Sequence, residues 1–323
     1  MPPSGAAPAL SLGAHPVACR AVEKVLLVAN AYAGSVSERK KQVIVNALRA
    51  DFKLEVADTA SRDHATELAR DAADRGFDAV LAFGGDGTIN EVAQGLVSTG
   101  VALGILPGGS TNVMARSLGI PVDPIEATAF VSAHLRSATK RRINVGRADG
   151  RYFLFSAGMG LDAEVVRRVE ADPDGKQQRG EWLWLAQALR AGLGQYRGAD
   201  PTITLEVEGE EARRVILVVC CNGRPFTYFR RWAVDVCPGA QLDRGLDVLG
   251  FERIRGAAVP RLVYSLFVSG SHVGWRSATY HHDLPGARMR ADDPLPVQVD
   301  GDYIGERTDL ELALVPDALD IVI

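Results

Sequence analysis

The sequence of 323 residues predicts an α/β half followed by a β-rich half. In the first half, short apolar runs alternate with amphipathic stretches of helical period, which is the pattern of a parallel sheet with crossover helices. In the second half, β-like runs follow one another with turn residues between them. We place the boundary between the two parts near Arg142.

Four apolar runs of the first half are predicted strands. They cover residues 25–28, 54–56, 79–83 and 101–105. The helical patterns between them start near Ser37, Ser61 and Asp86. Ligands of such sheets bind at the carboxyl ends of the strands, so the residues that follow each run are candidate site residues.

The second half contains six β-like runs. They cover residues 152–155, 202–207, 215–219, 246–249, 297–299 and 310–314. Residues 1–20 are rich in Pro, Ala, Gly and Ser and lack the apolar core of a secretory signal, so we expect a disordered tail. We therefore expect an α/β domain over 21–142 and a β-rich domain over 143–323, with 317–323 as a candidate for return to the first domain.

Charge, cysteine spacing and apolar segments indicate which partners and which cellular compartment to expect. The net charge of −4 gives no support to a nucleic-acid partner, which usually requires a clustered basic excess. The four cysteines, Cys19, Cys220, Cys221 and Cys237, lack zinc-site spacing, and the adjacent pair is poorly placed for a disulfide. No apolar segment approaches the roughly 20 residues that span a bilayer. We expect a cytoplasmic protein that reaches a membrane from the water side.

Small hydrogen-bonding residues follow all four predicted strands of the first half. The four segments are Asn30 to Ser35, Asp58 to Ser61, Gly84 to Thr88 and Pro107 to Asn112. Any one of them is equally well explained by turns and helix caps. Four at one edge of a sheet favour a nucleotide site, because glycine lets backbone N–H groups approach phosphate closely.

Two segments carry a family resemblance. Residues 84–92 read Gly-Gly-Asp-Gly-Thr-Ile-Asn-Glu-Val, and residues 106–121 read Leu-Pro-Gly-Gly-Ser-Thr-Asn-Val-Met-Ala-Arg-Ser-Leu-Gly-Ile-Pro. Together they resemble the catalytic domain of the diacylglycerol kinase and sphingosine kinase family, and soluble bacterial lipid kinases in particular. Segments 157–163, 237–247 and 299–302 follow in the family's order. The resemblance implies an ATP-binding α/β domain, a β-sandwich-like second domain and an active site in the cleft between them.

The resemblance implies phosphoryl transfer from ATP, with Mg²⁺, to the hydroxyl of a lipid alcohol, foremost diacylglycerol to give phosphatidic acid. Asp86 is expected to organise the magnesium and Asp302 to accept the proton of the lipid hydroxyl. The remaining residues expected to hold or shape the nucleotide site are Asn30, Thr59, Gly84, Gly85, Gly87, Thr88, Gly109, Ser110 and Asn112.

Two positions depart from the family pattern. Ser110 stands where the family commonly has Thr, and it keeps the hydroxyl. Asp302 stands where the family usually has Glu, so its carboxylate lies one methylene closer to the backbone. A general base must come within about 2.6 to 3.2 Å of the proton it takes, or act through one water. Asp302 is able to do so if its loop advances or a water bridges the gap.

Three further aspartates have two interpretations each. Asp243 and Asp247 could hold a second, structural Mg²⁺, as in resembling bacterial kinases, or could belong to plain β-turns. Asp162 matches a position near the family's acceptor site and could equally cap a loop.

Aromatic and aliphatic clusters at 182–185 and 262–267 predict peripheral contact with an anionic membrane. They are flanked by Arg179, Arg190, Arg253, Arg255 and Arg261. The alternative is an ordinary amphipathic helix that buries its apolar face. The family resemblance also makes a homodimer a reasonable expectation.

Two other functions share part of the pattern. A soluble NAD kinase also uses a Gly-Gly-Asp-Gly-Thr loop with a β-rich second domain, although residues 89–92 and 107–112 resemble the lipid kinases instead. A nucleotide or lipid sensor without turnover is the non-enzymatic alternative, which rests on the shortened carboxylate of Asp302.

Overall fold

The computed structural model describes residues 22–30, 37–172, 175, 181–194, 200–254 and 256–323. The predictions on the tail of residues 1–20 with Cys19, on the segment 31–35, on Arg179 and on Arg255 lie outside the described residues.

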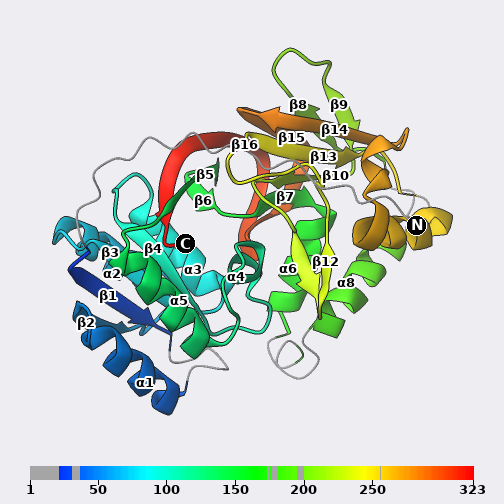
Figure 1. Ribbon diagram of the computed structural model, residues 1–323. Coiled ribbons are helices and arrows are strands. Elements are labelled where there is room, and N and C mark those ends of the chain that lie inside the picture. The colour runs from blue at the N-terminus through cyan, green and yellow to red at the C-terminus, as the bar shows by residue number, and fades with distance from the viewer. Residues whose placement is uncertain (1–21, 31–36, 173–174, 176–180, 195–199, 255) are drawn as a thin grey trace, which may run out of the picture.

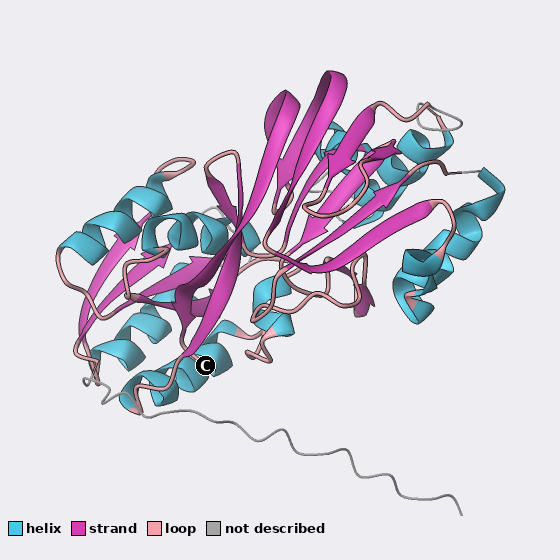
Figure 2. Ribbon diagram, turned by 90° about the horizontal axis from the view of Figure 1, so that it is seen from above, coloured by secondary structure: helices cyan, strands magenta, loops and turns pink. Residues whose placement is uncertain are grey.

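The first half is a parallel sheet with strand order β2-β1-β3-β4. The strands are β1 (Lys24–Ala29), β2 (Lys53–Asp58), β3 (Ala79–Gly84) and β4 (Ala102–Pro107). The helices are α1 (Glu38–Arg49), α2 (His64–Asp74), α3 (Asp86–Leu96), α4 (Val113–Ser117) and α5 (Pro124–Arg136). Figure 2 shows helices on both faces of these strands. Every residue of β3 and β4 is buried, as continuous apolar runs require in a sheet covered on both faces.

Helix starts follow the local capping chemistry. The Ser37 side chain accepts a hydrogen bond from Lys40 N at the start of α1, and Asp123 accepts from two backbone N–H groups at the start of α5. The predicted start of the second helix at Ser61 is three residues too early. Asp63 has a left-handed φ of 63°, so the chain turns before α2 begins at His64.

The second half is antiparallel. Its main strands are β5 (Arg141–Ala148), β6 (Arg151–Phe153), β7 (Ser156–Gly160), β8 (Ile203–Glu206), β9 (Arg213–Val215), β10 (Leu217–Cys221), β13 (Leu246–Phe251), β14 (Ala278–Leu284), β15 (Gly286–Val299) and β16 (Asp302–Ile321). A separate hairpin joins β11 (Thr227–Phe229) to β12 (Trp232–Val234). The helices are α6 (Leu161–Glu170), α8 (Glu181–Leu193) and α9 (Val259–Tyr264), with short turns of 3-10 or π type at Gly256–Ala258, Ser265–Ser269 and Ser271–Gly274.

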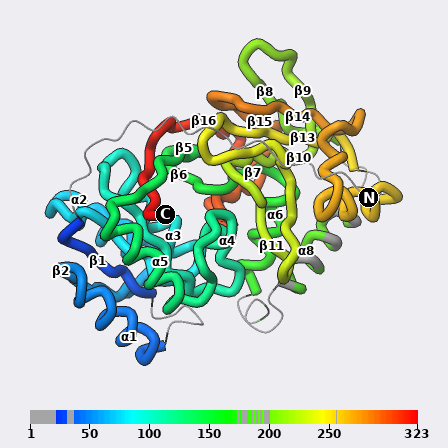
Figure 3. The backbone as a smooth tube through the Cα atoms, viewed as in Figure 1, coloured from blue at the N-terminus to red at the C-terminus, as the bar shows by residue number. Residues whose placement is uncertain are grey.

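The long strand β16 connects the two halves. It pairs with β15 near its start and with β5 further along, and Ile321 near its end pairs in parallel with Leu103 of β4. The C-terminus therefore lies beside the first-half sheet (Figures 1 and 3). The predicted class, a parallel α/β sheet followed by antiparallel strands, is confirmed.

Candidate active site

Two glycine loops touch at the carboxyl ends of β3 and β4. Gly108 N donates a hydrogen bond to Gly84 O at 2.7 Å. A Cβ placed on Gly109 would lie 2.8 Å from Gly85 Cα. The two backbones are therefore so close that position 109 has no room for a side chain. Backbone N–H groups held this close to a surface suit the binding of phosphate. Ser110 lies exposed at the tip of the second loop.

Asp86 and Asn112 fix these loops. Asp86 Oδ1 accepts a hydrogen bond from Met114 N at 3.2 Å, so the first residue of α3 holds the start of α4. Burial raises the pKa of Asp86, while backbone N–H groups of Val113, Met114 and Asn112 act in the opposite sense. Asn112 has a φ of 50° and closes its own loop, because it accepts from Gly109 N at 2.9 Å and donates to Gly109 O at 2.8 Å.

A cavity of about 190 Å³ opens at the ends of β1 and β2. It is lined by Asn30, Thr59, Ser61, Arg62 and Glu91. Asn30 Nδ2 donates to Thr88 Oγ1 at 3.0 Å, which joins the end of β1 to the first turn of α3. The structure thus brings together predicted residues from all four strand ends.

Glu91 of α3 holds the loop that carries Arg62. Glu91 Oε2 accepts from Ala65 N at 3.3 Å, and Thr66 Oγ1 donates to Glu91 O at 2.8 Å. The N-cap residue of α2, Asp63, makes no side-chain cap of its own. The carboxylate of Glu91 therefore does part of the capping of α2 from a neighbouring helix, and it fixes the start of that helix beside the cavity.

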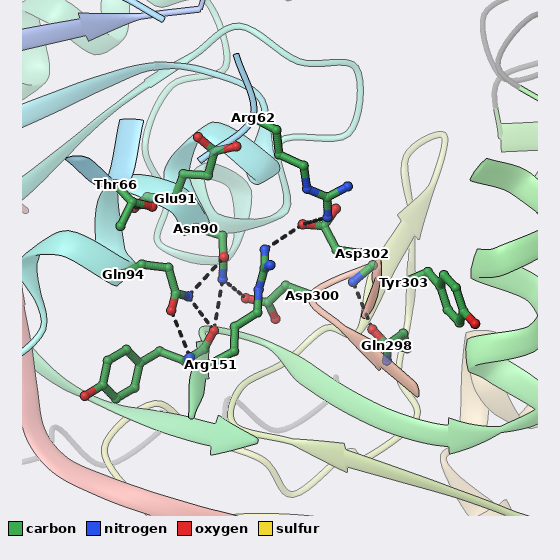
Figure 4. Close-up of polar contacts among 12 residues, drawn as sticks. Arg62, Thr66, Asn90, Glu91, Gln94, Arg151, Gln298, Asp300, Asp302 and Tyr303 are labelled. Carbon is green, nitrogen blue, oxygen red and sulfur yellow. Dashed lines mark hydrogen bonds and ion pairs between the residues drawn. The ribbon is translucent and has the colours of Figure 1, made fainter. Parts of the chain in front are cut away.

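Two amides of α3 hold elements of the second half (Figure 4). Asn90 Nδ2 donates to Asp300 Oδ2 at 2.7 Å. Gln94 Nε2 donates to Tyr152 O at 2.6 Å and Gln94 Oε1 accepts from Tyr152 N at 3.0 Å. One helix face therefore positions both the turn that carries Asp302 and the strand that carries Arg151.

Asp300 anchors the turn that precedes Asp302. Its carboxylate accepts from Leu154 N at 2.7 Å, Phe155 N at 2.8 Å and Ser156 N at 2.9 Å, besides the bond from Asn90. Burial raises the pKa of this carboxyl to about 6, and the four donors oppose that rise. The φ values of 48° at Asp300 and 83° at Gly301 complete the turn.

Asp302 lies between two arginines. Its Oδ2 is 2.8 Å from Arg151 Nη2 and 3.4 Å from Arg62 Nη2. Figure 4 shows the two guanidinium groups converging on this carboxylate from different elements. The Nε of Arg151 is buried and has no hydrogen-bond partner among the described residues. Because Arg62 also lines the cavity, this arginine connects the cavity to the carboxylate of the proposed base.

Asp162 is connected to the same turn through Gln298. Gln298 Nε2 donates to Asp162 Oδ2 at 3.0 Å, and Gln298 Oε1 accepts from Gly301 N at 2.9 Å. Burial raises the pKa of Asp162 to about 6. Its Oδ1 is buried without a partner among the described residues. Asp162 therefore lies in the first turn of α6 with one oxygen tied to the turn of Asp302.

Asp243 and Asp247 have different environments. Asp247 is fully buried, and its carboxylate contacts His282 Nδ1 at 2.6 Å, Asp283 N at 3.2 Å and the hydroxyl of Tyr280. Asp243 is exposed, and its Oδ2 lies 3.7 Å from Arg141 Nη2. Within the described ranges, no three His, Cys, Asp or Glu side chains are grouped so that they could hold a metal ion. A structural magnesium at these two aspartates stays a prediction.

The predicted aromatic clusters meet at one surface. The ring of Trp182 on α8 packs edge-on against Phe229 at 5.0 Å between centroids, and Phe229 packs against Phe267 at 6.3 Å. Trp182 is 58% exposed, and Trp232 and Tyr264 are similarly exposed. Among the helices of the described residues, none has the length and apolar character needed to cross a membrane.

Comparison with known proteins decides the family. A model described as the diacylglycerol kinase catalytic domain matches residues 24–148. A diacylglycerol kinase of Bacillus subtilis strain 168 is 39% identical over 269 residues, which cover 82% of this chain and 84% of that protein. The chain belongs to the diacylglycerol kinase catalytic-domain family of lipid kinases. Membership implies ATP as the phosphoryl donor.

Other members of the family align over longer stretches. A Pseudomonas aeruginosa UCBPP-PA14 protein named "Probable lipid kinase YegS-like" is 29% identical over 305 residues, which cover 92% of this chain and 93% of that protein. Two crystal structures from Bacillus anthracis str. Sterne share the fold. One superposes with a TM-score of 0.74 at 23% identity and covers 94% of this chain and 98% of its own. The other, described as a diacylglycerol kinase, has a TM-score of 0.68 at 20% identity and covers 93% and 96%.

Sequence analysis did not single out five residues that organise the site. They are Arg62, Asn90, Gln94, Arg151 and Asp300. Asn90 and Asp300 lie within the segments that carry the family resemblance, so a signal was present for both. The two arginines and Gln94 stand in no motif, and only the folded chain places them together.

Proposed function

We propose that this lipid kinase transfers the γ-phosphoryl group of ATP to the hydroxyl of diacylglycerol and forms phosphatidic acid. The observation that carries the proposal is the contact of the Gly85 and Gly109 loops, together with a neighbouring cavity lined by Arg62, the arginine that pairs with Asp302. The name of the Bacillus subtilis relative supports diacylglycerol as the acceptor.

The phosphate chain would be held by backbone N–H groups of the glycine loops. Gly84, Gly85, Gly87 and Gly109 supply those N–H groups, and the hydroxyls of Thr59, Thr88 and Ser110 assist. Asp86 lies where the two loops meet and would organise Mg²⁺ together with phosphate oxygens, since Mg²⁺ commonly binds one or two carboxylates plus substrate phosphates. A bound Mg²⁺ would neutralise part of the negative charge on the phosphate oxygens.

Asp302 would take the proton of the acceptor hydroxyl. The hydroxyl oxygen forms its bond to the γ-phosphorus, the bond from that phosphorus to the β-γ bridging oxygen breaks, and the hydroxyl proton moves to the Asp302 carboxylate. Asp162 and Gln298 hold the turn of Asp302 from the side of α6, and we propose that the acceptor binds on that side. The aromatic surface around Trp182 and Phe229 is the face we propose for contact with the membrane that supplies the lipid.

The test is lipid phosphorylation by the purified protein with ATP and Mg²⁺. Diacylglycerol, a sphingoid base, other lipid alcohols and NAD are offered separately, and products are identified by mass spectrometry. We expect phosphatidic acid, and we expect Asp86→Asn to lower turnover at least roughly 100-fold while the unfolding transition is retained. Near-normal turnover by Asp86→Asn would refute the role of this residue. Phosphorylation of NAD alone would identify a soluble NAD kinase instead.

The second candidate is a nucleotide sensor without turnover. The observation that favours it is the engagement of Asp302 by Arg62 and Arg151, which occupies the proposed base. Nucleotide binding without any phosphorylated product from the same panel would support this candidate.

A further inference from the structure

We infer that Arg62 and Arg151 together bind the phosphoryl group that is transferred, as a two-arginine clamp at the outer end of the phosphate chain. The inference rests on the proposed function and deepens it, because it assigns two residues that stand outside every motif discussed above. It makes the clamp, rather than the glycine loops, the part of the site that distinguishes a nucleoside triphosphate from a diphosphate.

Arg62 extends from the loop after β2 into the site. It lines the 190 Å³ cavity with Asn30 and Thr59, and its side chain is 55% exposed. The loop is held by Glu91, which caps the following helix from α3. Glu91 also lines the cavity, but its Oε2 accepts from Ala65 N. Arg62 is therefore a cation that lines the cavity, in the loop just before the helix that Glu91 caps.

Arg151 approaches from the second half of the chain. It lies on β6, next to Tyr152. The backbone N–H and C=O groups of Tyr152 both form hydrogen bonds with the side-chain amide of Gln94 on α3. The side chain is only 23% exposed, and its Nη2 lies 2.8 Å from Asp302 Oδ2. Its Nε is buried without a partner in the described part of the chain. A buried guanidinium N–H that lacks an acceptor is uncommon in folded proteins, and it points to an acceptor from outside the described residues, such as a bound ligand.

The chemistry of the corner suits a phosphoryl group. Two guanidinium groups face a single carboxylate, so the three side chains carry a net positive charge. Guanidinium groups present planar forks of donors that match phosphate oxygens in pairs, and charge-assisted hydrogen bonds of this kind are stronger than neutral ones. Asp302 keeps the two cations together, and this carboxylate is also the proposed base for the acceptor hydroxyl. The transferred phosphoryl group must lie next to that base, as the proposed clamp requires.

Binding measurements separate this inference from the proposed function. Calorimetry with Mg²⁺ compares ADP with a non-hydrolysable ATP analogue whose β-γ bridge is an imido group. We expect Arg62→Ala and Arg151→Ala each to weaken binding of the analogue about tenfold or more, and to change ADP binding less than about twofold. Arg151→Lys keeps the charge but not the fork, and an intermediate loss is expected.

Arg288→Ala is the matched control. This arginine lies on β15 with Nε 2.9 Å from Asp309 Oδ1, so it is also paired with an aspartate but lies in no part of the site. Binding of both nucleotides should be unchanged in this variant. Because Arg62 is exposed, its variant should keep the wild-type thermal transition, which makes it the decisive substitution if Arg151→Ala does not fold.

Three results would overturn the inference. Equal losses for ADP and the analogue in the arginine variants would show a general effect on the nucleotide site. Unchanged binding of the analogue would show that neither arginine contacts the terminal phosphate. If the wild-type protein binds neither nucleotide, the proposed function fails first and this inference fails with it.

Discussion

The contact between the two glycine loops can be tested with one added methyl group. Gly109→Ala places a Cβ 2.8 Å from Gly85 Cα and 3.2 Å from Asn112 Oδ1. Gly87→Ala adds the same methyl group to the first turn of α3, where nothing lies within 4 Å of the new Cβ. The two variants are chemically identical changes within the same proposed phosphate site, which makes them a matched pair.

The structure gives the size of the difference. Carbon atoms pack favourably at roughly 3.5 to 4.0 Å, so the loops must separate by about 1 Å to admit the Gly109 methyl group. Overpacking of this kind costs about 1 to 3 kcal/mol. The separation also weakens the 2.7 Å bond from Gly108 N to Gly84 O, a further loss of about 1 kcal/mol. Gly87 lies in the first turn of α3, where alanine gains up to about 1 kcal/mol over glycine.

Urea unfolding followed by circular dichroism measures both variants. We expect Gly109→Ala to be less stable than Gly87→Ala by at least about 2 kcal/mol, and to bind ADP more weakly because its phosphate-facing N–H groups have moved apart. Equal stability of the two variants, or a Gly87→Ala protein that is the less stable one, would refute the argument from close backbone contact.

Two further outcomes concern buried carboxylates of the second half. Asp300→Asn replaces an acceptor of four hydrogen bonds by an amide with one accepting oxygen, so we expect the free energy of unfolding to fall by about 2 to 4 kcal/mol in urea titration, with no loss in the exposed control Asp293→Asn. Asp162 has its pKa raised by burial from 3.8 to about 6, so its folded form binds a proton over a pH range in which the unfolded form is ionised. The contribution of Asp162 to the free energy of unfolding is greatest below about pH 4 and is lost as the pH rises through 6. The total loss is about 3 kcal/mol. The free energy of unfolding of the wild type minus that of Asp162→Asn should therefore decrease between pH 4 and pH 7, and a constant difference would contradict the assignment. The subtraction removes the effect of groups that titrate in the opposite sense. Glu164 is one of them, because Arg167 and Arg168 lower its pKa against the effect of its burial.

The central strands β3 and β4 were predictable because buried parallel strands are continuous apolar runs. The predicted range 79–83 starts with β3 and ends one residue before it. The predicted range 101–105 starts one residue before β4 and ends two residues before it. The long strands of the second half were recognised only in part. Prediction covered 297–299 of β15 and 310–314 of β16. At the start of β15, the exposed Arg288 and Arg290 alternate with the buried Ala287 and Met289, so the sequence there shows no apolar run. β5 begins with two exposed arginines and was not predicted.

The site divides in the same way. The glycine loops were predictable, since each follows its strand directly and carries the family motif. The arginines were not, because a single arginine has no local pattern and Arg151 is 151 positions from Asp302 along the chain. Their meeting depends on tertiary contacts of α3, where three polar residues, Asn90, Glu91 and Gln94, hold three separate elements.

The shortened carboxylate of Asp302 is consistent with such a clamp. The Asp302 carboxylate accepts a hydrogen bond from Arg151 Nη2 at 2.8 Å and lies 3.4 Å from Arg62 Nη2, so both guanidinium groups engage it while those contacts last. Phosphate oxygens compete for the same donors. If Arg62 and Arg151 turn to the terminal phosphate, the Asp302 carboxylate is released to accept a hydrogen bond from the acceptor hydroxyl when the phosphoryl group is in place. Nucleotide binding and activation of the acceptor hydroxyl would then be coupled through two arginines, so the loss of either arginine should affect both.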